Sequence, residues 1–235
     1  MNVAAKIDAA PGADWEANGW ELIPGFLGPD EIALLQAESD RLCGDSALFA
    51  ERGAVPNSAA RSDRLDPVID MSPMFAAVAN DSRLVALVGQ AIGGEPQLMK
   101  DKFIAKPPGA VGYGAHQDAA YWPGLGVDPD RFLTAIMFLD DATRENGAIE
   151  CVSGLHRELL TDPGSIADPD EEALGPFTMI EAKAGDLLLL HSLTPHRSGT
   201  NRSSGMRRAL LFTYGVDPRP DLYGVYKQLQ QELRH

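Results

Sequence analysis

Residues 184–215 read AGDLLLLHSLTPHRSGTNRSSGMRRALLFTYG, and this stretch decides the fold. It contains two short apolar runs, Leu187–Leu190 and Ala209–Phe212, separated by a segment rich in Pro, Gly, Asn and Ser. Apolar runs of strand length that are bounded by turn residues are typical of buried β-strands. The stretch therefore predicts two buried strands, with histidines and arginines where the strands meet the intervening loop.

The same alternation of short apolar runs and turns extends upstream to about residue 97. The segments between the runs, such as PPGAVG at 107–112 and RENG at 144–147, have the composition of turns. Further strands are expected at LMKDKFIAK (98–106), FLTAIMFLD (132–140), AIECV (148–152) and FTMIEA (177–182). Many short strands of this kind favour a mainly β protein built as a jelly-roll-like sandwich or barrel.

The N-terminal third has helical periodicity instead. Residues 1–14 are small and polar and are expected to form a loose lead-in, followed by a short strand and a helix that begins at 28–31, GPDE. Proline fits the first turn of a helix, and the acids complement the positive end of its dipole. Apolar spacing within 72–94 predicts two further helices, and the polar segment from about Ala54 to Asp66 is expected to be a functional loop.

The length of 235 residues suits one domain with one substantial core. The whole chain, 1–235, is therefore expected to be a single domain. Its helical part spans about 15–95, its jelly-roll core about 96–216, and a C-terminal amphipathic helix about 220–233. That last helix is expected to pack on the core, with dimerisation or closure over the site as alternatives.

Composition narrows the classes of partner. The formal net charge of −14 argues against nucleic acid, which needs a basic footprint, and favours a neutral or cationic small molecule. A solvated acidic surface explains the same charge equally simply. Cys43 and Cys151 lie far apart without metal-site or redox spacing, so they are expected to be ordinary buried thiols. No signal segment or run of about 18 apolar residues is evident, so a cytoplasmic protein without a membrane span is expected.

Metal-binding residue types are concentrated in GAHQDAAYW, residues 114–122. His116 and Asp118 are two apart, so in an extended chain both side chains project to the same face. One imidazole and one carboxylate are two of the three ligands of the facial triad that holds non-haem iron(II). The third ligand must come from another strand, and both His191 and His196 are candidates.

Two arginines open the last predicted strand. A dicarboxylate cosubstrate needs a fixed cation for its far carboxylate, and the guanidinium fork suits that role. Arg207 and Arg208 are adjacent, so their side chains point to opposite faces of the strand and only one can enter the barrel. Solubilising charge at a strand end is the alternative interpretation of both.

An ordered set of motifs resembles the phytanoyl-CoA dioxygenase-like family over roughly residues 15–216. The motifs are H-Q-D at 116–118, E-N-G at 145–147, S-G-L-H at 153–156, A-G-D-L-L-L-L-H-S at 184–192, and H-R-S-G-T-N followed by R-R-A within 196–209. G-W-E-L-I-P-G-F-L at 19–27 and K-P-P at 106–108 support the likeness.

The resemblance implies a double-stranded β-helix, the cupin-like jelly roll, with supporting N-terminal helices and iron(II) at one end. It implies that His116 and Asp118 are the proximal metal ligands and His196 the distal one, with His191 a neighbour. It also implies that Arg207 grips a carboxylate of 2-oxoglutarate.

Further roles follow from the same resemblance. Ser198 is expected beside the cosubstrate, and Arg208 is expected to face outward. Many relatives carry a tryptophan where this chain has Thr134, so its hydroxyl is expected to replace an indole N–H against the cosubstrate. His156 is expected to be structural. Lys102 is expected to reach the cosubstrate or the mouth of the site, with a solvated lysine as the alternative.

The implied activity is that of an Fe(II)- and 2-oxoglutarate-dependent dioxygenase. It would use O₂ to hydroxylate a C–H bond of a small polar metabolite or natural product and convert 2-oxoglutarate to succinate and CO₂. The Asp118 carboxylate favours hydroxylation or a related oxidation, because halogenases of this fold replace it with a small residue. Gln117, Tyr121 and Trp122 are expected to contact substrate, the two aromatic residues as a wall, with burial in the core as the alternative for both aromatic residues.

Two alternatives stay open: a metal-dependent cupin enzyme that does not use 2-oxoglutarate, and a non-catalytic jelly-roll module that binds a ligand. A homodimer is possible for each.

Overall fold

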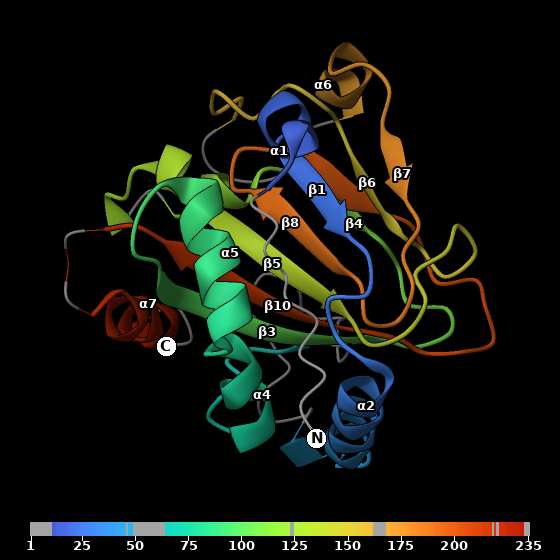
Figure 1. Cartoon of the computed structure of the whole chain (residues 1–235). Helices are drawn as coiled ribbons and strands as arrows, with labels where there is room; N and C mark the ends of the chain where they lie inside the picture. The colour runs from blue at the N-terminus through green and yellow to red at the C-terminus, as the bar shows by residue number, and fades with distance from the viewer. Residues whose placement is uncertain are drawn as a thin grey trace.

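The computed structural model describes residues 11–45, 47–48, 64–122, 125–161, 168–217, 219 and 221–232. Within these residues the strands form two antiparallel sheets, and helices lie outside the larger one (Figure 1). The predicted mainly β, jelly-roll architecture is confirmed. The expected loop from about Ala54 to Asp66 lies mostly outside the described residues; Arg64–Leu65, at its end, is a short strand.

The larger sheet has six strands among the described residues. Its strand order is β1 (Trp20–Ile23), β8 (Leu187–His191), β5 (Phe132–Phe138), β10 (Arg207–Gly215), β3 (Gln97–Lys106) and β2 (Arg64–Leu65). Every residue of the central strand β5 is buried, because helices cover one face of the sheet and the second sheet lies against the other. The apolar runs that predicted these strands are thus the runs buried on both faces.

The smaller sheet has the order β4 (Tyr113–His116), β9 (His196–Ser198), β6 (Ile149–Cys151) and β7 (Thr178–Ile180). Between the sheets lies an apolar core that includes Ile136, Ile149, Leu188 and Ala209. Two candidate metal ligands are strand ends that meet in this sheet: His116 ends β4 and His196 begins β9, whereas Asp118 follows β4 by two residues.

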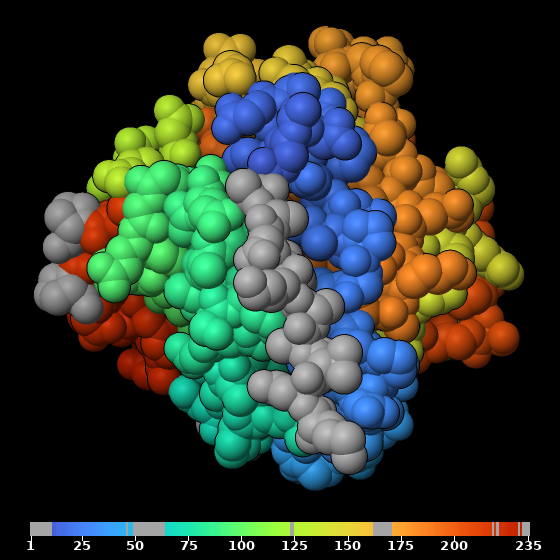
Figure 2. Space-filling view, viewed as in Figure 1, coloured from blue at the N-terminus to red at the C-terminus, as the bar shows by residue number. Residues whose placement is uncertain are grey.

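Helices cover the outer face of the larger sheet. They are α2 (Pro29–Cys43), α4 (Pro73–Ala79) and α5 (Ser82–Ile92). The predicted start of α2 is confirmed: the backbone N–H of Gly28 donates to Glu31 Oε2 at 2.8 Å. Segments before β3, blue and green in Figure 2, form most of the surface on this side. They bury Phe75 and Leu84 against the sheet.

The N-terminal segment departs from expectation. A six-residue helix, α1 (Ala13–Asn18), precedes β1, so the end of the expected loose lead-in is helical. Trp15 anchors α1 in the core and donates from Nε1 to the carbonyl of Ala91 at 3.1 Å. Gly19 ends the helix with a φ of 76°, a left-handed conformation that suits glycine.

The C-terminal helix α7 (Leu222–Glu232) lies against β3 (Figure 1). Leu222 and Tyr226 are buried with Trp122, so packing on the core is the observed role. Among the described residues, no helix combines the length and apolar character that a membrane span needs. Cys151 is a buried free thiol as expected, whereas Cys43 is only partly buried.

The remaining described elements are short: a 3₁₀ turn η1 (Asp118–Tyr121), a second 3₁₀ turn η3 (Pro129–Arg131) and α6 (Asp168–Ala173).

Candidate metal centre

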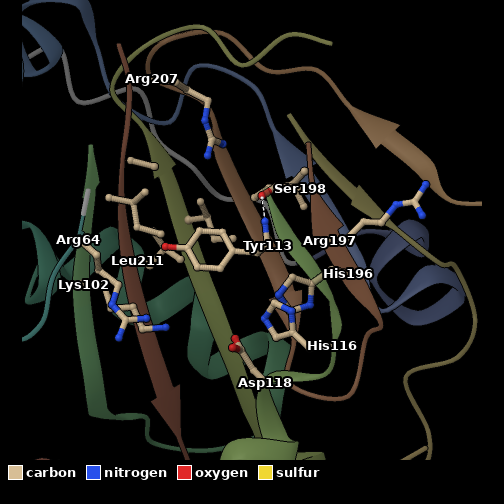
Figure 3. Close-up of a pocket in the computed structure, with 14 residues that line it drawn as sticks. Arg64, Lys102, Tyr113, His116, Asp118, His196, Arg197, Ser198, Arg207 and Leu211 are labelled. Atoms are coloured by element: carbon tan, nitrogen blue, oxygen red, sulfur yellow. Dashed lines mark hydrogen bonds between the residues drawn. The ribbon is translucent and has the colours of Figure 1, made fainter. Parts of the chain in front are cut away.

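A cavity opens between the two sheets, and the candidate site residues meet in it (Figure 3). One wall comes from β10, where Arg207, Ala209 and Leu211 alternate inward. Its lining also includes Arg64, Lys102, Ile104, Tyr113, His116, Asp118, Ile136, Ile149, His196, Arg197 and Ser198. Aliphatic side chains thus share the lining with a larger set of polar and charged groups, which suits a small polar ligand.

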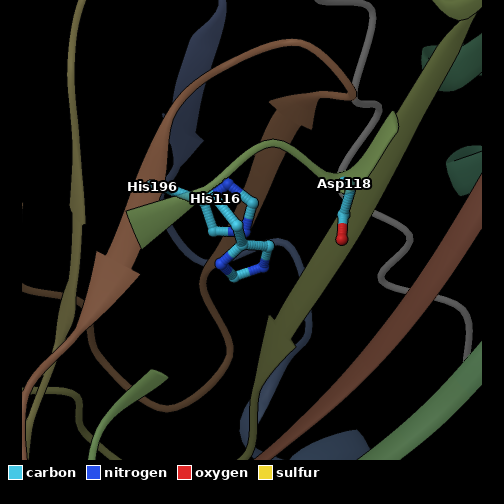
Figure 4. Close-up of side chains that lie close together, drawn as sticks. All are labelled: His116, Asp118 and His196. Atoms are coloured by element: carbon cyan, nitrogen blue, oxygen red, sulfur yellow. The ribbon is translucent and has the colours of Figure 1, made fainter. Parts of the chain in front are cut away.

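Strand pairing brings the two histidines together. His116 ends β4 and His196 begins β9, and the two residues are directly opposed in the antiparallel pair. Their ring centroids are 4.2 Å apart. Asp118 follows two residues after His116, and its carboxylate faces both rings (Figure 4). One ligand atom from each of the three residues lies within 4.8 Å of the others, so a single ion can contact all three.

Backbone carbonyls orient both imidazoles. His116 Nδ1 lies 2.8 Å from the carbonyl oxygen of Gly114, and His196 Nδ1 lies 2.9 Å from that of Thr194. A carbonyl oxygen only accepts hydrogen bonds, so in each ring Nδ1 carries the proton and donates it. The Nε2 lone pairs then remain for a metal, which is the usual arrangement of metal-binding histidines.

The electrostatics keep two of the candidate ligands, His116 and Asp118, in the protonation states that a metal requires. Burial lowers the pKa of His116 to about 3, and neighbouring His196 adds to the effect, so His116 is neutral at pH 7. Burial alone would raise the pKa of Asp118, but the charges of Lys100, then His196 and Lys102, hold it well below its usual value. Neutral imidazoles and an ionised carboxylate are the forms that bind metal.

Thr134 contacts this carboxylate. Its hydroxyl donates to Asp118 Oδ2 at 2.8 Å and lies 3.0 Å from the hydroxyl of Thr213. The structure therefore gives Thr134 a contact with a candidate metal ligand, where the resemblance had implied a contact with the cosubstrate.

Arg207 and Arg208 point to opposite faces of β10, as predicted. Arg207 is buried and lines the cavity at some distance from the triad (Figure 3). Arg208 faces the helices, where Nε and Nη2 donate to the two carboxylate oxygens of Asp140, both at 2.8 Å. Ser198 lines the cavity, and its Oγ accepts from the backbone N–H of Tyr113 at 3.2 Å and from Lys106 Nζ at 3.4 Å.

The three residues expected to contact substrate are outside the lining of the cavity, although Tyr121 adjoins it. Gln117 is buried, and its amide bonds the backbone of Leu193 and Leu160, at 2.5 and 2.7 Å. Trp122 is buried beside Phe132. Tyr121 is 48% exposed and meets the edge of the His116 ring, with centroids 5.5 Å apart. None of the three lines the cavity as the described residues define it.

His191, the alternative distal ligand, belongs to different surroundings. Its Nδ1 accepts from the backbone N–H of Leu193 at 3.2 Å, and its Nε2 lies 3.2 Å from the carbonyl oxygen of Asp130. The ring packs against Trp15 and His156, with centroids 5.8 and 5.4 Å away. Among the described residues the cluster able to hold a metal contains His196 and omits His191.

Sequence reasoning missed several cations near the site. Lys100, Lys102 and Lys106 recur at even spacing on β3, so they share its inner face with Ile104. This period-two pattern was visible in the sequence, although only Lys102 was singled out. Arg64 joins them on β2, opposite Ile104, through a pairing that no local pattern announces.

The family model described as phytanoyl-CoA dioxygenase matches residues 15–209. The chain belongs to the phytanoyl-CoA dioxygenase family. The expectation from its motifs is therefore confirmed.

Individual proteins are also similar in sequence to this chain. A probable alpha-ketoglutarate-dependent hypophosphite dioxygenase of Stutzerimonas stutzeri is 31% identical over 170 residues, which cover 65% of this chain and 58% of that protein. This chain thus spans less than two thirds of that relative's length. A methylphosphonate hydroxylase of Gimesia maris is 25% identical over 217 residues, covering 90% of this chain and 82% of that protein.

A solved structure shows the same fold. The structure of EctD from S. alaskensis with bound Fe superposes with a TM-score of 0.80 at 21% identity, covering 94% of this chain and 85% of that chain. In the present chain, the geometry of His116, Asp118 and His196 also suits an iron(II) centre. Two imidazoles with Nε2 available and one carboxylate form the facial donor set that leaves other coordination positions open.

Proposed function

We propose that this chain is an Fe(II)- and 2-oxoglutarate-dependent dioxygenase that hydroxylates a C–H bond of a small polar molecule. One observation carries the proposal: a two-histidine, one-carboxylate cluster and the inward-facing Arg207 line the same cavity. The relatives named above as an alpha-ketoglutarate-dependent dioxygenase and a hydroxylase support it. Fe(II) and 2-oxoglutarate supply the activation of O₂, with formation of succinate and CO₂, that oxidation of an unactivated C–H bond requires.

His116, Asp118 and His196 would hold the metal on one side and leave the opposite side accessible. The hydrogen bonds to Gly114 and Thr194 carbonyls fix both rings. Because Nδ1 donates to a carbonyl oxygen in each ring, these contacts fix both the tautomer and the ring orientation, and they would direct Nε2 at a bound ion.

Arg207 would bind the far carboxylate of 2-oxoglutarate, with the hydroxyl of Ser198 as a second donor. A buried guanidinium is a strong bidentate partner for a carboxylate. Lys106 Nζ holds this corner by bonding Ser198 Oγ and the carbonyl oxygen of Gly199. Lys102 lines the same cavity but lies four residues along β3 from Lys106, so we do not assign it to this corner of the cosubstrate.

Apolar side chains would exclude water around the bound cosubstrate. Ile136 and Ile149 line the cavity from the two sheets, and Ala209 lines it from β10. The free space of about 640 Å³ in this region includes the open solvent at the mouth of the cavity.

The decisive test adds Fe(II) and then 2-oxoglutarate to metal-free protein without oxygen. A visible charge-transfer band of the iron–2-oxoglutarate chelate is expected in the wild type. Asp118→Ala should abolish the band by removing a ligand. Arg207→Gln should raise the concentration of 2-oxoglutarate needed for half the band at least tenfold, the cost of about one charge-assisted hydrogen bond.

Arg208→Gln is the matched control, because Arg208 has the same side chain and adjoins Arg207 but faces the helices. It should titrate like the wild type. Bound iron without a band would replace the proposal with a metal-dependent cupin chemistry that does not use 2-oxoglutarate. Failure to bind iron at all would leave a ligand-binding module.

A further inference from the structure

The lining of the cavity is more cationic than the composition of the chain suggests. The chain carries a formal net charge of −14, yet four cationic side chains line this cavity. Asp118 is the one acid among the described residues that line it. These cations are Arg64, Lys102, Arg197 and Arg207. An acidic protein that collects cations in its site is arranged to bind anions.

Two of the four cations already have roles. Arg197 forms ion pairs with Glu150 and Glu171, each at 2.8 Å, so its charge is balanced within the protein. Arg207 is assigned to the far carboxylate of 2-oxoglutarate. With the cosubstrate in place, the net charge would be zero, because the positive charges of iron(II) and Arg207 equal the negative charges of Asp118 and the 2-oxoglutarate dianion. Arg64 and Lys102 then remain as the two basic side chains of the lining that have no role yet, with Asp66 beside Arg64 but outside the lining.

Arg64 and Lys102 form a second cationic group, separate from Arg207. On β2 and β3, Arg64 is paired with Ile104, so Arg64 and Lys102 are diagonal neighbours on the inner face. Figure 3 shows both across the cavity from the two imidazoles. On the neighbouring strand Arg207 is opposite Lys106 and Leu211 is opposite Lys102. Four residues along a strand separate the two groups by about 13 Å of backbone.

The existing partners of these two cations leave room for an anion. Arg64 Nη2 lies 3.8 Å from Asp66 Oδ2, which is longer than a hydrogen bond. A guanidinium has five N–H donors, so this contact leaves several available. Burial, then the charges of Lys100 and Arg64, lower the pKa of Lys102, and an anion beside it would reverse that effect.

We propose that the substrate carries a negatively charged group, a phosphonate or a carboxylate, and that Arg64 binds this group with Lys102 beside it. The proposal rests on the function proposed above and names the substrate class of the same site. It replaces the expectation of a neutral or cationic substrate, which followed from net charge alone. Ile104 and Leu211 line the cavity next to these cations, so a short apolar chain attached to the anion would lie along them.

The test uses four small probes that differ in charge but share a short unbranched carbon chain: propylphosphonate, butyrate, butan-1-ol and butylammonium. Each is titrated calorimetrically, without oxygen, into protein saturated with Fe(II) and 2-oxoglutarate. The two anions should bind at least tenfold more tightly than the alcohol or the amine. Arg64→Gln should weaken binding of the anions about ten- to hundredfold, and Arg64→Lys should restore part of it.

Arg144→Gln is the matched control, because Arg144 is exposed and is not among the residues that line the cavity. It should leave binding of the anions unchanged. The 2-oxoglutarate titration of Arg64→Gln should stay within twofold of the wild type. An equal loss of 2-oxoglutarate binding would overturn the proposal by assigning Arg64 to the cosubstrate. Tighter binding of the alcohol or amine, or no binding of either anion, would overturn it as well.

A separate readout keeps this result distinct from failure of the proposed function. Propylphosphonate is titrated into metal-free Arg207→Gln protein, which lacks the other arginine that lines the cavity and faces its interior. If propylphosphonate binds to the Arg207→Gln protein but not to the double variant that also carries Arg64→Gln, the anion site is supported. This result holds even if the iron–2-oxoglutarate band never appears. Binding that is unaffected by Arg64→Gln contradicts it.

Discussion

Thr134 donates a hydrogen bond of 2.8 Å to Asp118, from the central strand β5 to the carboxylate of the candidate triad. The hydroxyl is itself within 3.0 Å of the hydroxyl of Thr213 on β10. A buried carboxylate with one oxygen held in this way keeps the other oxygen directed at a metal. This contact explains why a small hydroxyl residue suits a position that the resemblance had linked to a bulky indole.

Replacing Thr134 with valine should weaken iron binding without unfolding the site. Valine has nearly the same shape but cannot donate, so Asp118 loses the bond that orients it. Loss of such an outer contact typically lowers metal affinity ten- to hundredfold. Competition with a chelator would measure the change, with Thr134→Ser as the control that keeps the donor. Equal iron affinity in the wild type and the valine variant would contradict this role.

The two candidate distal ligands can be separated by substitution. His196→Gln should lower Fe(II) affinity at least a hundredfold, because it removes one of three ligands. His191→Gln should leave iron affinity within about twofold, since the backbone of Leu193 occupies His191 Nδ1. The Fe(II) affinity of each variant is measured from its metal content after dialysis against buffers of known free Fe(II) concentration. Loss of iron from the two variants to the same extent would return His191 to the list of ligands.

Some features of this molecule could be predicted because they depend on local rules. The start of α2 follows from the acids and proline after Gly28, and the opposite faces of Arg207 and Arg208 follow from the pleat of a strand. Motif resemblance added the pairing of H-Q-D with the distal histidine, which brings residues 80 positions apart into one cluster.

Other features depend on tertiary contacts that local patterns do not contain. The helix α1 has only six residues, too few to show periodicity, and is held by packing of Trp15. Trp122 was assigned to a substrate wall because an aromatic residue beside a metal strand has the same sequence signature whether it lines a site or fills a core. Arg64 joins the cavity only through the pairing of β2 with β3.

Arg208 should matter for stability and little for cosubstrate binding. It joins β10 to helix α2 and to the end of β5 through Asp140, Asp40 and the hydroxyl of Ser39. Removing the guanidinium leaves the Asp140 carboxylate, 20% exposed, without its paired donor. Arg208→Gln should therefore lower the free energy of unfolding by about 2 kcal/mol. Urea unfolding measures this.

The control for Arg208 is Arg41→Gln on the solvent side of α2, where the side chain is 57% exposed and pairs with Glu38. Its unfolding midpoint should stay close to that of the wild type, since an exposed ion pair adds little to stability. If Arg208→Gln and Arg41→Gln shift the midpoint equally, the network around Asp140 has no special role.

A pH dependence should arise from the histidine pair His156 and His191, which lies outside the metal cluster. Burial lowers the pKa of both His156 and His191. The charge of Arg157 lowers the pKa of His156 further, and the charge of His156 lowers that of His191. Glu16 and Asp130 also line this region and oppose the shift. The net direction is downward for both rings, so each is more easily protonated in the unfolded chain than in the folded protein.

The sign of the effect follows from the protons bound in each state. Between the ordinary histidine pKa of about 6.5 and the lower folded value, the unfolded chain binds more protons, so the free energy of unfolding falls as pH falls through this window. Above that window the contribution of the neutral rings is fully present. Metal-free wild type should therefore lose stability in urea between pH 7 and pH 5. The loss should be smaller in His156→Gln and in His191→Gln, and His116 cancels in the comparison because every variant retains it. Identical pH slopes in the wild type and both variants would show that neither ring is kept neutral by the fold.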